Sequence, residues 1–212
     1  MHTLTTSIVL AALLVLGLSG GVAAQAPPDG QITIAFDASI APTFLDPADT
    51  SGVATPFVFL YALHDALIKP LPGNNMAPCL AESWKESADG LTYEFKLRDG
   101  LKFHNGDPFT AEDVKFSFHR YRGTSAKLLH ERVKSVEVVD PLRVRFVLNA
   151  PWPDFLVFYA TPATGAAWVV PKKYVERVGD EGFRRQPVGL GPYKFVRMSP
   201  GLELVLEANE QY

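Results

Sequence analysis

The chain has 212 residues, 47% of them hydrophobic, and its formal net charge is −3. A chain of this length and composition can bury a core in one or two domains. The basic residues are scattered along the sequence, which argues against a nucleic-acid partner. Seventeen prolines and sixteen glycines indicate a turn-rich protein rather than a bundle of helices.

The first 26 residues contain no Asp, Glu, Lys or Arg and carry an apolar run over 8–18. This run is too short to cross a bilayer, and the small residues that follow fit a cleavage site between Ala24 and Ala26. We therefore expect residues 1–26 to be a signal peptide, with an uncleaved membrane anchor as the alternative. The single cysteine, Cys79, permits no intramolecular disulfide and lies too far from this segment to carry a lipid anchor. We expect it to be a small buried hydrophobic residue rather than a reactive thiol.

The first elements of the exported chain are predicted from three neighbouring patterns. Residues 31–36, QITIAF, are rich in β-formers and predict a first strand. Residues 41–52 contain two prolines, two aspartates and a glycine, which predict a loop. Residues 53–71 carry apolar side chains on all sides, and we expect a largely buried helix that stops at Pro70.

The clearest strand signal lies at residues 91–98, LTYEFKLR, where apolar and polar residues alternate strictly. This period of two is that of a half-buried strand. Turns are predicted at Asp99-Gly100 and Asn105-Gly106. A helix should then begin after Thr110, with Asp113 completing a variant capping box. The apolar face of that helix would be formed by Val114, Ser117, Phe118 and Tyr121.

The remaining segments predict strands joined by packed loops. Residues 134–140 and 143–148 flank Asp140-Pro141 and predict a hairpin. Residues 151–175 are aromatic and interrupted by prolines, which predicts irregular, packed connections. The glycines of 189–195 predict a turn that enters a strand, because a third glycine and a following helix are absent. Two final strands are expected on either side of Ser199-Pro200-Gly201.

A polar cluster at residues 104–113 raises the question of a metal or catalytic site. It contains His104, Asp107, Glu112 and Asp113. A zinc site needs three or four converging ligands, and no HxxxH or CxxC pattern accompanies these residues. Carboxylates in a first helical turn complement the helix dipole, so we interpret the cluster as turn and cap chemistry. We therefore predict no metal and no cofactor.

No known catalytic signature is present elsewhere in the sequence. There is no G-x-S-x-G elbow, no P-loop and no H-E-x-x-H motif, and the five histidines are widely dispersed. From the residues alone, the sequence predicts an exported α/β protein, and both a binding protein and an unrecognised enzyme remain open.

Three blocks of the sequence resemble the family 5 extracellular solute-binding proteins, the peptide and nickel class of receptors for ABC importers. The signature region is LAESWKESADGLTYEFKLRDGLKFHNGDPFTAEDVKFSFHR at 80–120. A later block, VGLGPYKFVRMSPGLELVLEANEQY, lies at 188–212, and TFLDPADTSG at 43–52 matches the loop after the first strand. The resemblance covers about 31–212.

The resemblance implies an α/β fold of the periplasmic-binding-protein kind, two-lobed and type II-like, with the extra subdomain of the peptide class. Residues 31–48 would start lobe I, 49–170 would form its additional subdomain, and 171–212 would return into lobe I. Lobe II would be missing, which makes this chain the N-terminal part of a longer receptor.

The resemblance also implies a ligand-contacting segment. In dipeptide-binding members, a Thr-Ser-Gly in the loop after the first strand touches the bound peptide, and Thr50, Ser51 and Gly52 stand in that place. Hydroxyls and an open glycine N–H can pair with peptide backbone groups without selecting a side chain. The alternative is an ordinary helix cap. Phe44 and Leu45 are weaker candidates for the wall of the cleft.

The function implied is that of a periplasmic, monomeric substrate-binding component, not an enzyme. It would capture di- or oligopeptides and deliver them to an ABC permease complex in the inner membrane. The alternatives are the same receptor class for a nickel chelate, sugar or opine, or an exported hydrolase whose catalytic part lies further along the chain.

Overall fold

The computed structural model describes residues 30–35, 42–49, 59–160 and 164–212, and it divides the chain into two units, 1–37 and 38–212. In the first unit, residues 31–35 are exposed and form no strand, so the strand predicted at 31–36 is wrong over its described part. A strand exists only where a neighbour completes its hydrogen-bond ladder. The predicted signal peptide lies outside the described residues. No helix in the described ranges is long and apolar enough to cross a membrane.

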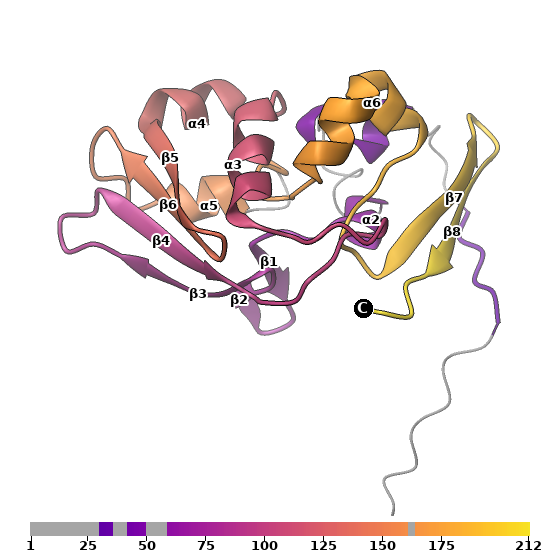
Figure 1. Cartoon of the computed structure of the whole chain (residues 1–212), viewed down its shortest axis with the longest axis horizontal. Helices are drawn as coiled ribbons and strands as arrows, with labels where there is room; N and C mark the ends of the chain where they lie inside the picture. Colours follow the sequence, from indigo (N-terminus) through magenta and orange to yellow (C-terminus); the bar gives the residue numbers. More distant parts are fainter. Residues whose placement is uncertain (1–29, 36–41, 50–58, 161–163) are drawn as a thin grey trace, which may run out of the picture. The chain divides into compact units, whose positions relative to one another are not determined.

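The second unit contains a four-stranded antiparallel sheet of order β3-β4-β6-β5 (Figure 1). Its strands are β3 (Ala81–Glu86), β4 (Thr92–Leu97), β5 (Val133–Asp140) and β6 (Arg143–Leu148). The strand predicted at 91–98 and the hairpin predicted around Asp140-Pro141 are therefore confirmed. Alternation places Tyr93, Phe95 and Leu97 on the buried face of β4, because successive side chains point to opposite faces.

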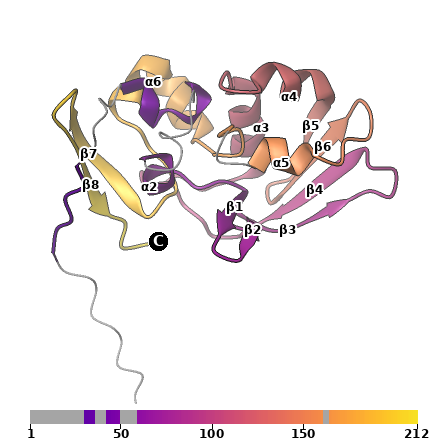
Figure 2. The ribbon, with the colours of Figure 1, turned by 180° about the vertical axis from the view of Figure 1, so that it is seen from behind.

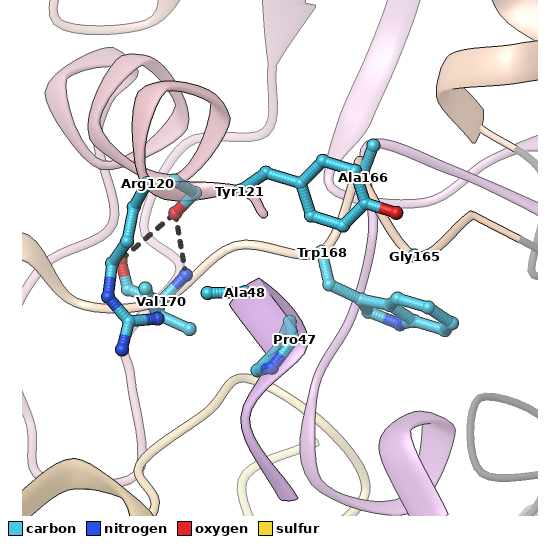
Figure 3. Close-up of a pocket in the computed structure, with 9 residues that line it drawn as sticks. Pro47, Ala48, Arg120, Tyr121, Gly165, Ala166, Trp168 and Val170 are labelled. Atoms are coloured by element: carbon cyan, nitrogen blue, oxygen red, sulfur yellow. Dashed lines mark hydrogen bonds between the residues drawn. The ribbon is translucent and has the colours of Figure 1, made fainter. Parts of the chain in front are cut away.

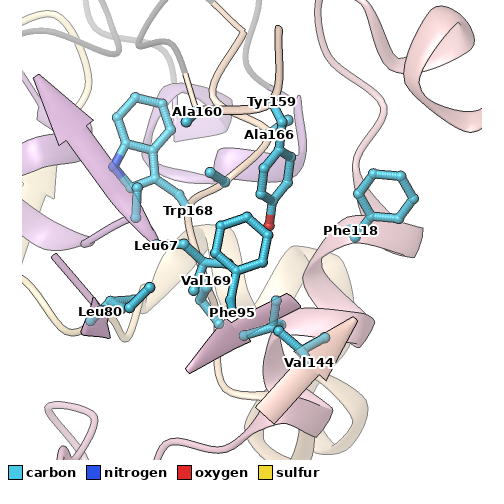
Figure 4. Close-up of a cluster of buried hydrophobic side chains, with 14 of the residues drawn as sticks. Leu67, Leu80, Phe95, Phe118, Val144, Tyr159, Ala160, Ala166, Trp168 and Val169 are labelled. Carbon is cyan, nitrogen blue, oxygen red and sulfur yellow. The ribbon is translucent and has the colours of Figure 1, made fainter. Parts of the chain in front are cut away.

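Helices cover the buried face of this sheet. They are α3 (Ala111–Arg120), α4 (Ala126–Arg132) and α5 (Phe155–Ala160). Phe146 of β6 lies 5.4 Å from Phe118 of α3 and 4.9 Å from Tyr159 of α5, measured between ring centroids. The labelled rings of Figure 4 show that Phe95 points into the same cluster. All four rings are buried, and their apolar area holds the helices against the sheet.

Within the described residues, the helix predicted over 53–71 is confirmed only over 59–63 and is wrong from residue 64 onward. Residues 59–60 lead into a short turn of helix, α2 (Tyr61–Leu63), and the chain then becomes extended and forms a hairpin from β1 (Ile68–Leu71) and β2 (Asn74–Pro78). The backbone of Leu67 donates to Ala167 and accepts from Cys79 and Ala81. An extended segment buried on both sides is apolar all round, and periodicity cannot distinguish it from a buried helix.

The C-terminal part adds one helix and one hairpin. Helix α6 (Lys172–Arg185) lies beside α3 in both views of the ribbon (Figures 1 and 2). It breaks at Gly179, whose φ of 69° is left-handed. Strands β7 (Tyr193–Ser199) and β8 (Glu203–Ala208) form the predicted final hairpin. The prediction of irregular structure at 151–175 holds only between the helices, since α5 and the start of α6 fall inside it.

Candidate ligand-binding site

The loop that the sequence singled out begins with two short 3-10 helices, η1 (Pro42–Leu45) and η2 (Pro47–Asp49). Thr50, Ser51 and Gly52 follow directly and lie outside the described residues. Phe44 is half-buried. Leu45 has no exposed surface, and its carbonyl accepts a hydrogen bond from His64 Nε2 at 3.1 Å. A fully buried side chain cannot line an open cleft, which favours a supporting role for Leu45.

A buried ion pair anchors this η1–η2 segment to α3. Asp46, with no exposed surface, accepts hydrogen bonds from both terminal nitrogens of Arg120, each at 2.6 Å. Arg120 is the last residue of α3 and its side chain is only 6% exposed. Two parallel N–H···O bonds between guanidinium and carboxylate are the strongest geometry of such a pair. The Asp46 carboxylate also accepts the backbone N–H of Ala48 at 3.0 Å, so it holds its own turn as well.

The pair belongs to a larger group, which we call the arginine–aspartate cluster. Its members are Asp46, Asp49, Asp180, Arg120, Arg122 and Arg184. Asp180 lies just after the break in α6 and accepts from both Arg120 and Arg122. Burial acts to raise the pKa of Asp180, but the hydrogen bonds and charges of the two arginines outweigh it and lower that pKa. The two arginines thus favour the ionised form of Asp180 where three separate segments meet.

A small hollow lies between η2, the end of α3 and residues 165–170 (Figure 3). Its volume is about 10 Å³. In Figure 3 the ring of Tyr121 and the indole of Trp168 lie on opposite sides of the backbone of residues 165–170. A space of this size holds roughly one water molecule and excludes a peptide. The side of the η1–η2 segment that faces α3 is therefore packed and unavailable to a ligand.

A much larger groove, of about 540 Å³, opens on another part of the second unit. Among its lining residues are Lys69, Cys79, Arg98, Leu101 and Tyr212. The polar groups largely serve each other: Lys69 donates to Tyr212, and Arg98 Nε donates to the carbonyl of Cys79 at 2.6 Å. Of the ligand contacts predicted from the sequence, Phe44 and Leu45 are described, and neither lines this groove. Burial raises the pKa of Cys79 to about 12, which favours the predicted hydrophobic role over a reactive thiol.

The polar cluster at 104–113 forms the turn and cap that the sequence predicts. The Asp113 carboxylate accepts the backbone N–H of Thr110 at 2.9 Å, as the capping box requires. It also accepts the N–H of Lys172 at 2.9 Å, so a single carboxylate caps the starts of both α3 and α6. Asp107 closes its turn by donating its N–H to Asn105. Within the described ranges, no group of three or more His, Cys, Asp or Glu side chains could hold a metal ion.

His104 has a long-range role that the sequence reasoning missed. Its backbone N–H donates to Gly189, its Nδ1 accepts the N–H of Gly189 at 3.2 Å, and its Nε2 donates to the carbonyl of Gly191 at 2.9 Å. The imidazole is thereby fixed as the neutral Nε2–H tautomer. The two closely spaced glycines let residues 189–191 approach residues 62–64 closely, and no local pattern in the sequence indicated the contact with His104.

Acidification should destabilise the chain through two histidines that the structure keeps neutral. Burial lowers the pKa of His64 to about 3 and also lowers the pKa of His104. Both protonate near pH 6.5 when unfolded, so below that pH the unfolded state binds more protons and the free energy of unfolding falls. The slope should approach about 1.4 kcal/mol per pH unit for each histidine until its folded-state pKa is reached.

Urea unfolding at pH 7, 6 and 5 measures this slope, and a His104→Asn variant should show a smaller one. A free energy of unfolding that does not change between pH 7 and pH 5 would contradict the neutral state of these histidines.

Comparison with known proteins identifies relatives along nearly the whole chain. The "Di/tripeptide-binding protein 2" of Pseudomonas aeruginosa (strain UCBPP-PA14) is 34% identical over 94% of this chain and 41% of its own length. The MoaA protein of A. tumefaciens R10, solved with mannopinic acid, is 32% identical with a TM-score of 0.69, over 79% of this chain and 35% of that one. NikZ from Campylobacter jejuni, solved with Ni(L-His), is also 32% identical, with a TM-score of 0.67 over 78% of this chain and 33% of that one.

The chain thus spans about two fifths of the curated relative's length. The profile of the family described as "Bacterial extracellular solute-binding proteins, family 5 Middle" matches residues 75–212, which is well over half of the chain. The matched range contains the four-stranded sheet, the helices that cover it, and the final hairpin. The chain belongs to the bacterial extracellular solute-binding proteins of family 5.

Proposed function

We propose that this chain belongs to the substrate-binding component of an ABC importer, and that it captures di- or oligopeptides and delivers them to a membrane permease. The observation that carries the proposal is the 34% identity, over 94% of this chain, to a di/tripeptide-binding protein. The protein would be exported by residues 1–26, act as a monomer in the periplasm, and bind without making or breaking a bond.

The proposed contacts are Thr50, Ser51 and Gly52, with Phe44 beside them. Contacts to the backbone of a peptide let one receptor accept many side chains. The described residues support the proposal through the η1–η2 segment that leads into Thr50. The arginine–aspartate cluster anchors one side of this segment. Leu45 would act beneath this segment rather than in the cleft, because its side chain is fully buried.

In this proposal the chain supplies one side of a two-lobed receptor. Residues 31–48 start lobe I, 49–170 form its additional subdomain and 171–212 return into lobe I, while lobe II lies outside the 212 residues. Closure of the lobes would bury the ligand, and the closed form would be what the permease recognises.

The test is isothermal titration of the protein, purified in the length in which the cell makes it. The panel contains di- and tripeptides, a nickel–histidine chelate and mannopinic acid, which represent the ligand classes of the relatives. Saturable binding of the peptides, with a Kd of about 1 μM or below, is expected. Binding of only the chelate or the opine would overturn the peptide assignment while leaving the receptor class intact.

A further inference from the structure

Asp49 is held by two arginines that come from different helical regions. Its Oδ1 accepts Nε of Arg122 at 3.1 Å, and its Oδ2 accepts Nη2 of Arg184 at 2.5 Å and Nε at 3.1 Å. Arg122 follows the end of α3, and Arg184 lies in the last turn of α6. The backbone N–H of Arg122 also donates to Ala48 at 2.8 Å. The end of η2 is thus fixed to both helical regions at once.

Asp49 differs from Asp46 in exposure, and this difference separates two roles within the cluster. The pair of Asp46 and Arg120 is almost completely buried. Asp49 keeps 21% of its side chain exposed, and its partners Arg122 and Arg184 keep 46% and 26%. Partly exposed pairs contribute little to global stability, whereas a buried pair that loses one partner costs much more. The contacts of Asp49 therefore do little for the fold as a whole, although they are numerous.

Asp49 is also the cluster member nearest in sequence to the proposed ligand contacts. It precedes Thr50 directly and closes the segment that carries Phe44. Its backbone N–H donates to Asp46, so a shift of Asp49 would disturb the turn that the buried pair holds. Burial acts to raise the pKa of Asp49, but the bonds from Arg184 and Arg122 outweigh it, so the carboxylate stays ionised at neutral pH.

We propose that Asp49 is a positioning residue for ligand binding: through Arg122 and Arg184 it holds the η1–η2 segment, which carries Phe44 and leads in sequence into Thr50, against α3 and α6. This inference rests on the proposed function of the segment. Asp49 touches no ligand in this proposal and acts by keeping residues 42–49 in place before the ligand arrives. Contacts that are ordered in advance lose less conformational entropy on binding, and affinity rises accordingly.

The decisive comparison is between the variants Asp49→Asn and Asp180→Asn. Each replaces one carboxylate oxygen of the cluster with an NH2 group that cannot accept from arginine, and each removes a negative charge that pairs with two arginines. Only Asp49 lies in the η1–η2 segment and directly precedes Thr50, whereas Asp180 lies in α6. Two quantities are measured in the protein at its cellular length: peptide affinity by titration, and hydrogen exchange of the backbone amides of Asp46, Ala48 and Asp49.

Asp49→Asn should weaken peptide binding at least tenfold and accelerate exchange at these three amides at least tenfold. Asp180→Asn should change both less than twofold, and the two variants should have similar urea midpoints. Equal effects of the two variants, or no change in exchange with Asp49→Asn, would overturn the inference. If the unmodified protein binds no peptide, the proposed function fails, and hydrogen exchange still decides whether Asp49 positions the segment.

Discussion

Replacing Gly189 by alanine should destabilise the chain by at least about 3 kcal/mol or prevent folding. A Cβ at this position would lie 1.9 Å from the carbonyl oxygen of Leu63 and 2.6 Å from Nδ1 of His64. Neither neighbour can withdraw easily. The Leu63 carbonyl accepts a hydrogen bond from Gly191, and the His64 ring is fully buried. The measurement is the free energy of unfolding in urea.

The matched control is Gly73→Ala in the turn between β1 and β2. A Cβ there would meet no atom within 4 Å, but φ is +78°, so alanine experiences only the strain of the left-handed conformation. That strain is about 1–2 kcal/mol. Equal losses in the two variants would show that the close approach at Gly189 is not what the structure describes.

Replacing Arg120 by methionine should lower the free energy of unfolding by about 3–5 kcal/mol. The substitution keeps an apolar stem of similar length but leaves Asp46 buried without its bidentate partner. The contact of the guanidinium with the ring of Phe183, at 5.4 Å from the ring centroid, is lost as well. A buried carboxylate without a partner is costly because no water replaces the two lost hydrogen bonds.

Two further variants show whether this cost comes from burial. Arg185→Met removes an arginine whose ion pair with Glu181 is about four fifths exposed on both sides, and stability should change within experimental error. In the Arg120→Met background, Asp46→Ala should cost far less than it does alone, since the unpaired charge is removed too. Additive losses in the double variant would contradict a coupled buried pair.

The parts of the fold that the sequence predicted are those with a strong local signal. Alternation at 91–98 fixed the buried face of β4, and Thr110 with Asp113 marked the start of α3. Each of these signals is formed by residues that lie within a few positions of one another along the chain. The helix predicted over 53–71 was wrong from residue 64 onward because burial on both sides gives an extended segment the same apolar pattern as a buried helix. No sequence period separates these two cases.

Features made by distant segments were not predictable in the same way. The bonds of His104 to residues 189 and 191 connect positions more than 80 residues apart. Asp49 and Arg184 are 135 residues apart, and Arg184 lies in the part of α6 that follows the break at Gly179. The candidate contacts Thr50, Ser51 and Gly52 came from resemblance to a family. No physical pattern in the sequence distinguished them from a helix cap.

The measurement that tests the central claim most directly is recovery of the ligand after binding. The protein, in the length in which the cell makes it, is incubated with a tripeptide, separated from free peptide by gel filtration, and denatured. The released peptide is then identified by mass spectrometry. A receptor should release the tripeptide intact and in a stoichiometric amount. Cleaved fragments, or no peptide in the protein fraction when the titration panel also shows no binding, would contradict a receptor that carries peptides without altering them.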